Sequence, residues 1–386
     1  MARVRHKCFL PFLPLLLLGA TALAQNTAKT VEQIRVYYDA ARRFEAEGNW
    51  QKAEQTWRNV LRLAKKDARA WTNLGVVLNR QEKPNEAMEA WRQAISLDPK
   101  LPGAYFNLGL ALVRAGDYAN ANAPLRQALS LEPNNDGARR ALAIALMGQE
   151  KYQEASREIA QLLFRSPEDA ALLELAAKSF LQQRRYQEAA TVLERRLSLP
   201  NTTSFLWSQY GDALDGAGRT PEALEAYRKA VALDPESIIT RYGLGYLHWK
   251  LYQYDNAERE LLEVLRRAPN DPRASFTLGD LYLTRADAQR ALPLLETARA
   301  AYPDEFDTRF ALGRALVLTG KLDRGIDELV VAVKLNDSIA DGHFQLGRAL
   351  MKAGRTEEGK RELQKAQAIH DQQRKNEAER YRKKLP

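Results

Sequence analysis

The chain has 386 residues, of which 45% are apolar and 28% are charged, and its formal net charge is +9. These fractions are typical of a folded protein and exclude an intrinsically disordered one. No dense stripe of lysine and arginine interleaved with aromatic residues precedes the C-terminal tail, so we expect no nucleic-acid partner.

Residues 1–24 have the pattern of a cleavable signal peptide. Three basic residues, Arg3, Arg5 and Lys7, precede an apolar stretch from Cys8 to Leu18, and Ala22-Leu23-Ala24 supplies a small–x–small cleavage motif. The pattern predicts cleavage after Ala24 and a periplasmic or secreted protein. The apolar stretch is shorter than the roughly 20 residues that span a bilayer, so we expect no stable transmembrane span after cleavage. The alternative is that the segment is retained as an anchor.

The only cysteine of the sequence, Cys8, lies within this leader. The mature chain would therefore contain no disulfide, no catalytic thiol and no cysteine-ligated zinc, which suits an oxidising compartment. Residues 25–33, which follow the leader, are predicted to form a short N-terminal linker.

From residue 34 onward the sequence repeats itself every 34 residues. The segment Ala70-Trp71-Thr72-Asn73-Leu74-Gly75 recurs as Ala104-Tyr105-Phe106-Asn107-Leu108-Gly109. The repeats open at Ile34, Ala68, Pro102, Asp136, Ala170, Ser204, Ile238, Pro272, Phe306 and Ala340. The eighth position of every repeat is small: Ala41, Gly75, Gly109, Ala143, Ala177, Gly211, Gly245, Gly279, Gly313 and Gly347. The twentieth is also alanine or glycine throughout.

Each of these positions has a physical reason. Small residues at the eighth and twentieth positions let two helices approach closely. A glycine between them, at Gly48, Gly116, Gly218, Gly320 and Gly354, would end the first helix in a left-handed conformation. Proline near the end of most repeats stops the second helix. Each unit is therefore predicted to be a helix–turn–helix that must stack on its neighbours to bury its apolar face.

This pattern resembles the tetratricopeptide repeat family. The resemblance implies an all-α, right-handed superhelical solenoid of about ten helix–turn–helix repeats over residues 34–373. One departure is Arg139, which stands where an apolar residue is usual. Residues 374–386 form a basic C-terminal tail, interpreted as a solvating cap helix or, alternatively, as an anchor to an anionic surface.

The sequence contains no pattern that indicates catalysis. The histidines His248, His343 and His370 have no second metal ligand at a suitable spacing, and no nucleophile elbow or phosphate-binding glycine loop is present. His343 is interpreted as a packed residue of a helix face. We therefore predict no enzyme, no cofactor and no metal site.

Within the family, the first helices of successive repeats line a concave groove. The fifth position of the last four repeats forms an aromatic row, and other aromatic and arginine residues fall close to it. The candidate partner-binding residues are Tyr242, Tyr246, Trp249, Phe276, Phe310, Arg314, Phe344 and Arg348. Aromatic and arginine side chains often anchor interfaces, so we predict a peptide or helix groove in which the arginines receive carboxylates. The alternative is that the aromatic rings pack in the seams between adjacent first helices.

Two functions remain open at this point. The first is a protein–protein interaction scaffold of the cell envelope that holds a peptide or helical segment of a partner. The second is a non-catalytic accessory subunit of an envelope glycan-synthesis or secretion system. The sequence does not choose between them, because a solenoid supports either.

Overall fold

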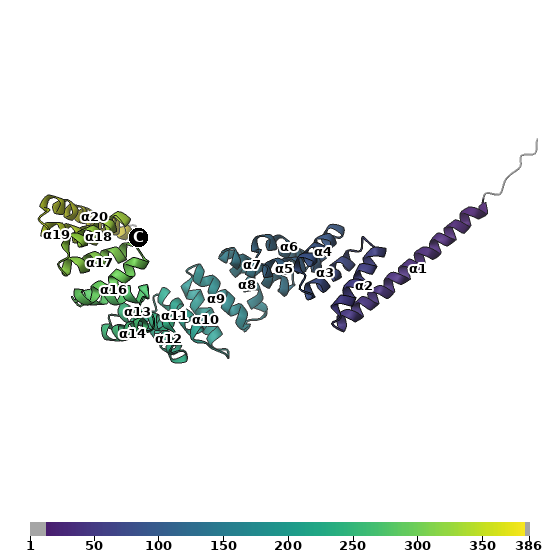
Figure 1. The fold of residues 1–386 in the computed structure, drawn as a ribbon, viewed down its shortest axis with the longest axis horizontal. Coiled ribbons are helices and arrows are strands. Elements are labelled where there is room, and N and C mark those ends of the chain that lie inside the picture. Colours follow the sequence, from purple (N-terminus) through teal and green to yellow (C-terminus); the bar gives the residue numbers. More distant parts are fainter. Residues whose placement is uncertain (1–12, 383–386) are drawn as a thin grey trace, which may run out of the picture. The chain divides into compact units, whose positions relative to one another are not determined.

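The computed structural model describes residues 13–382 of the chain. The basic residues of the predicted signal peptide, Arg3, Arg5 and Lys7, lie outside this range. The described residues form twenty α-helices and no strand (Figure 1). The all-α fold class predicted from the sequence is confirmed.

The helices alternate between first and second members of successive pairs. The first helices are α1 (Leu13–Ala46), α3 (Ala68–Arg80), α5 (Pro102–Arg114), α7 (Asp136–Gly148), α9 (Ala170–Gln182), α11 (Ser204–Gly216), α13 (Ile238–Lys250), α15 (Pro272–Thr284), α17 (Phe306–Leu318) and α19 (Ala340–Lys352). The second helices are α2 (Trp50–Leu63), α4 (Pro84–Leu97), α6 (Tyr118–Leu131), α8 (Tyr152–Arg165), α10 (Tyr186–Leu197), α12 (Thr220–Leu233), α14 (Tyr254–Arg267), α16 (Ala288–Ala301), α18 (Leu322–Leu335) and α20 (Thr356–Arg382). Every first helix after α1 begins at the residue where the sequence period opens a repeat.

The chain divides into two compact units, which are described separately. Unit 1 is Met1–Gln183 and unit 2 is Arg184–Pro386, so the division falls in the turn between α9 and α10. Within each unit, consecutive helices pack against one another along the chain. That residues 34–373 form one array of ten repeats stays a prediction.

The small residues of the repeat allow close helix contact, as expected. A Cβ atom added to Gly313 of α17 would lie 2.7 Å from Cγ of Leu329 and 3.1 Å from the backbone oxygen of Gly325 in α18. The second atom belongs to the backbone and cannot rotate away. The glycines at these positions therefore set the distance between the paired helices.

Residues 25–33 are helical, so the expectation of a separate linker is corrected. They lie within α1, which runs without interruption from Leu13 to Ala46. The physical reason is that no glycine or proline occurs between Gly19 and Gly48. At the other end, α20 continues beyond its repeat, and the side chains of residues 374–379 are exposed.

The turn between paired helices has a left-handed residue in every repeat. The predicted glycines have positive φ angles, from 70° at Gly48 to 82° at Gly320. Five residues other than glycine adopt the same conformation at the equivalent position: Glu82, Glu150, Arg184, Tyr252 and Ala286. The geometry of the turn is thus imposed by the packing of the two helices, with or without a glycine to ease it.

These turns allow a direct test of backbone strain. Ala286 is exposed and has φ of 61°. Replacing Ala286 by glycine is expected to raise the free energy of unfolding by about 1 kcal/mol, because a Cβ is unfavourable in this conformation. Gly320→Ala should have the opposite effect of about the same size. Urea unfolding followed by circular dichroism measures both, and two changes of the same sign would contradict the explanation.

Candidate partner-binding surface

The described residues contain no group of three or more histidine, cysteine, aspartate or glutamate side chains placed to hold a metal ion. Among the helices that the structure describes, none is both long enough and apolar enough to cross a membrane. The surfaces that remain to be considered are the two faces of the helix stack, formed by the first and the second helices.

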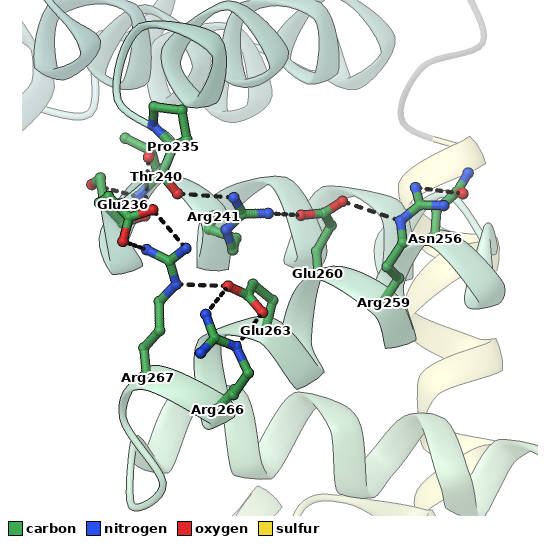
Figure 2. Close-up of polar contacts among 11 residues, drawn as sticks. Pro235, Glu236, Thr240, Arg241, Asn256, Arg259, Glu260, Glu263, Arg266 and Arg267 are labelled. Atoms are coloured by element: carbon green, nitrogen blue, oxygen red, sulfur yellow. Dashed lines mark hydrogen bonds and ion pairs between the residues drawn. The ribbon is translucent and has the colours of Figure 1, made fainter.

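The second-helix face of unit 2 carries a network of mutually paired charges (Figure 2). Arg241 of α13 donates to Oε2 of Glu260 in α14 at 2.7 Å and to the backbone oxygen of Pro235 at 2.8 Å. Glu263 accepts from both Arg266 and Arg267, and Arg267 also pairs with Glu236. A hollow of about 760 Å³ lies among several of these groups. Because these charged side chains pair with one another, their ion pairs account for the charged residues of this face.

The contact between Arg241 and Glu260 belongs to a recurrent bridge, which we name the 4/23 bridge after its positions in the repeat. Arg139 donates to Glu158 at 2.7 Å and to the backbone oxygen of Pro133 at 2.7 Å. The same geometry joins Arg309 to Glu328 and to the backbone oxygen of Pro303, at 2.6 Å each. The guanidinium thus connects both helices of its repeat with the end of the preceding repeat. This explains why Arg139 stands at a position that is usually apolar.

His343 takes the place of arginine in the last 4/23 bridge. Its side chain is buried, as predicted for a packed residue of a helix face. Nδ1 lies 2.6 Å from Glu362 and Nε2 lies 3.0 Å from the backbone oxygen of Asp337. Burial raises the pKa of Glu362, but hydrogen bonds from Lys365 and His343 outweigh it and hold that pKa below its usual value. His343 is therefore accounted for by packing.

On the first-helix face of unit 2, three of the predicted residues stack in series along α13. The ring centroids of Tyr242 and Tyr246 are 6.2 Å apart, and those of Tyr246 and Trp249 are 5.6 Å apart. Tyr242 and Trp249 also pack against the buried core of repeats seven to nine, as does Phe276. Burial raises the pKa of the Tyr242 hydroxyl. Tyr242, Trp249 and Phe276 are therefore partly buried by contacts with the core.

The remaining two aromatic residues differ from each other. Phe310 stacks on Phe306 with centroids 5.4 Å apart and packs against the core formed by α18 and α19. Phe344 is 41% exposed and lies under the guanidinium of Arg348, whose Cζ is 5.7 Å from the ring centroid. Phe344 is the member of the aromatic row that is most available to a partner.

Arg314 and Arg348 lie together at the edge of one hollow of about 490 Å³. Neither has a hydrogen bond or ion pair with another residue in the part of the chain that the structure describes, although Arg314 lies over Phe310. Val317, Leu318 and Lys352 also line the hollow, and Leu318 is 59% exposed. We call this surface, together with the Phe344 ring that lies under Arg348, the unit-2 groove. It is defined by Arg314, Val317, Leu318, Phe344, Arg348 and Lys352.

Three residues near the groove were missed by reading the sequence. Leu318 and Lys352 occupy the thirteenth position of their repeats, and Asp280 occupies the ninth, as Arg314 and Arg348 do. Burial raises the pKa of the Asp280 carboxyl, although the charge of Arg314 and a hydrogen bond from Trp249 oppose this effect. The signal that could have identified these three residues is their place at the ninth and thirteenth positions of the repeat.

Comparison with known families agrees with the repeat geometry. Tetratricopeptide repeat models match residues 112–179, 216–278 and 276–338, and a further TPR repeat model matches residues 78–116. The chain belongs to the tetratricopeptide repeat family. The prediction made from the 34-residue period is thereby confirmed.

Two curated relatives match a short part of this tetratricopeptide repeat protein. Cellulose synthase operon protein C of Salmonella typhimurium is 32% identical over 84 residues, which is 22% of this chain and 7% of that protein. The protein of the same name from Escherichia coli K12 is 31% identical over 84 residues, with the same coverage. The match therefore spans less than a tenth of the length of either relative.

Several solved structures are similar to this chain over part or most of its length. MamA from Desulfovibrio magneticus RS-1 is 23% identical, with a TM-score of 0.41, over 45% of this chain and 99% of that one. A chain of the Cut9–Hcn1 hetero-tetramer of the APC/C is 15% identical, with a TM-score of 0.48, over 91% of this chain and 92% of the matched chain. PilF of Pseudomonas aeruginosa is 21% identical, with a TM-score of 0.44, over 54% of this chain and 95% of that one.

Proposed function

We propose that this protein is a non-catalytic interaction scaffold of the cell envelope, and that the unit-2 groove binds a peptide or helical segment of a partner protein. The observation that carries the proposal is the pair Arg314 and Arg348. Both guanidiniums lack a hydrogen bond or an ion pair with any described residue and border one hollow. Unpaired arginines beside exposed apolar side chains are typical of interface anchors.

The composition of the groove indicates the chemistry of its partner. Leu318 and Phe344 offer exposed apolar surface, while Arg314, Arg348 and Lys352 offer positive charge. An amphipathic helix with apolar residues at i, i+3 and i+4 and carboxylates beside them would satisfy both. Arginine accepts a carboxylate in a bidentate geometry, which fixes the orientation of the bound segment.

The envelope location rests on the signal-peptide pattern of residues 1–24. The absence of an enzymatic role is supported by the repeat itself, since its recurrent residues serve helix packing and its recurrent charges form the 4/23 bridges. Both statements are part of the proposal.

The groove is tested by removing its charges without touching the core. We expect Arg314→Gln with Arg348→Gln to weaken partner capture from the native envelope fraction by about tenfold or more, because each charged hydrogen bond contributes about 1.5–3 kcal/mol. A matched control is Arg361→Gln with Arg374→Gln, two exposed arginines of α20 without ion pairs in the described part of the chain. Equal capture by both double variants would rule the groove out.

Phe344→Ala is the corresponding test of the apolar part. Because Phe344 is exposed and Phe310 packs against the core, only the first can be removed with little loss of stability. Leu262→Ala on α14 removes a comparable exposed side chain from the other helix layer and is the control. Capture that falls for Phe344→Ala alone supports the groove, and capture that is unchanged contradicts it.

The second candidate function is an accessory role in envelope glycan synthesis or secretion. The observation that favours it is the 84-residue match to cellulose synthase operon protein C. Mass spectrometry of the captured partner distinguishes the two functions. A glycan-synthesis or export component, encoded near this gene, would favour the accessory role, and an unrelated envelope protein would favour the general scaffold.

A further inference from the structure

The eleventh position of the repeat holds a leucine, phenylalanine or tyrosine in nine repeats and a histidine in repeat seven. The nine residues are Phe44, Leu78, Leu112, Leu146, Phe180, Leu214, Tyr282, Leu316 and Leu350. His248 occupies this position in α13, and only 3% of its surface is exposed. A titratable ring therefore stands where the other repeats carry an apolar or aromatic side chain, so its protonation would place a charge inside the helix stack.

The contacts of the His248 ring suit its neutral form. Nδ1 lies 2.7 Å from Oε1 of Gln253, the residue directly before α14. Nε2 has no hydrogen-bond partner in the part of the chain that the structure describes. A neutral imidazole with its proton on Nδ1 donates to the amide oxygen, whereas an imidazolium carries a second N–H that would find no acceptor. Protonation would therefore bury both a charge and an unsatisfied donor.

The charges that act on the His248 ring come from α12 and α14, and together they do not favour its protonation. Arg228 of α12 and Arg259 of α14 disfavour an imidazolium, whereas Glu260 of α14 favours it. Glu260 already pairs with two arginines, so its charge is largely neutralised. Burial has the largest effect and lowers the pKa of His248, although the hydrogen bond to Gln253 opposes it.

His343, the other buried histidine among the described residues, has the opposite surroundings. Both of its ring nitrogens lie beside acceptors, the carboxylate of Glu362 and the backbone oxygen of Asp337. A ring that carries two protons can donate to both of them. Acid therefore preserves the contacts of His343, while it leaves His248 with an unmatched charge. The two buried rings should respond differently to a fall in pH.

We propose that His248 makes repeat seven an acid-sensitive element of unit 2, in which protonation of the ring loosens the packing of α13 against α12 and α14. Repeats nine and ten keep their contacts under the same conditions. The stacked rings of Tyr242, Tyr246 and Trp249 lie on α13, so this part of the first-helix face would open with the helix. The inference goes beyond the unit-2 groove and does not depend on it.

The direction of the pH dependence follows from the lowered pKa of His248. The unfolded chain takes up the proton near the ordinary value of about 6.5, whereas the folded chain takes it up only at a lower pH. The stability of repeat seven is therefore complete above about pH 6.5, and it falls between that pH and the lower pKa of the folded state.

The proposal is tested by hydrogen exchange of the whole purified chain at about pH 7.5 and pH 5.5, corrected for the pH dependence of the chemical exchange step. Protection of α13 and of the start of α14 should fall about five- to tenfold in acid, while protection of α17 to α20 stays constant. His248→Leu, which introduces the residue of six other repeats, should abolish the loss. Equal losses in the wild type and in His248→Leu would overturn the proposal, as would a loss spread evenly over unit 2.

Gln253→Glu tests the contact itself, because it gives the ring the kind of partner that His343 has. Two other repeats carry an acid at this position, Asp117 and Asp287, so a carboxylate is compatible with the turn. NMR of the His248 ring should show a wild-type titration midpoint below about pH 6.5 and a rise of about 1–3 pH units in Gln253→Glu. An unchanged midpoint, or a wild-type midpoint at or above the ordinary value, would contradict the proposal.

His343→Arg is the matched control, since it removes the other buried histidine and introduces the arginine that other 4/23 bridges carry. The acid-induced loss of protection in α13 and α14 should be the same in this variant as in the wild type. Its disappearance would assign the acid response to repeat ten and refute the role of His248. Circular dichroism verifies the helicity of each variant. If His248→Leu fails to fold, the exchange of Gln253→Glu decides, because this variant should lose less protection in acid than the wild type.

Discussion

Replacing Glu158 by glutamine is expected to lower the free energy of unfolding by about 3 kcal/mol, one of the largest losses from a single polar change in this chain. The substitution leaves the guanidinium of Arg139, which is almost completely buried, without its counter-charge. The backbone oxygen of Pro133 and the amide oxygen of the new glutamine could still accept hydrogen bonds from it, but neither carries a negative charge. A buried charge that loses its partner retains its desolvation cost, which is the physical reason for the loss.

Removing both members of this 4/23 bridge should cost much less than removing one. We expect Arg139→Met with Glu158→Leu to recover about 2 kcal/mol relative to the sum of the single changes. The chain itself supports this expectation, because repeats two and six carry Trp71 with Ala90 and Trp207 with Ala226 at the same two positions. A double-mutant cycle by urea denaturation measures the coupling. Additive losses would show that the bridge contributes no specific pairing.

Replacing Trp57 by alanine is expected to lower the free energy of unfolding by about 3–5 kcal/mol. Trp57 is completely buried in α2, and its ring meets that of Tyr38 edge-on at 4.7 Å. Its Nε1 also donates to Oε1 of Glu45 at 2.5 Å, which ties α2 to α1. The substitution removes a large apolar surface, leaves a cavity and deprives Glu45 of its donor.

The loss at Trp57 should be local, because each repeat of a solenoid contacts only its neighbours. Hydrogen exchange is expected to show faster opening of α1, α2 and α3, with no change in α7 to α9. Phe164→Ala removes another aromatic ring from unit 1, but this ring is 90% exposed, and the change should stay within about 0.5 kcal/mol. Faster exchange spread evenly over unit 1 would contradict a nearest-neighbour description of its stability.

The expected losses at Glu158 and Trp57 identify the side chains that stabilise the fold and that are therefore not available to a partner. Arginines of first helices pair with glutamates of second helices, and the buried aromatic and alanine residues hold the stack together. Exposed side chains of the first-helix face, such as Leu318 and Phe344, are therefore free to vary without loss of the fold.

The sequence alone determined the family and the helix register. The first helices from α3 to α19 begin where the 34-residue period predicts because that register depends on local features, namely small residues at close contacts, left-handed glycines in turns and proline at helix ends. Such features act within one repeat and recur, so ten copies support one interpretation. The same reasoning predicted that His343 would be packed.

Only the tertiary structure decided which side chains are available to a partner. Phe310 and Phe344 occupy the same position of adjacent repeats, yet the first packs against the core and the second is exposed. The sequence also did not show that Arg314 is unpaired and that Arg139 is paired, because both depend on residues brought close by helix packing. Local chemistry sets the repeat, and the contacts between helices decide what remains free to bind.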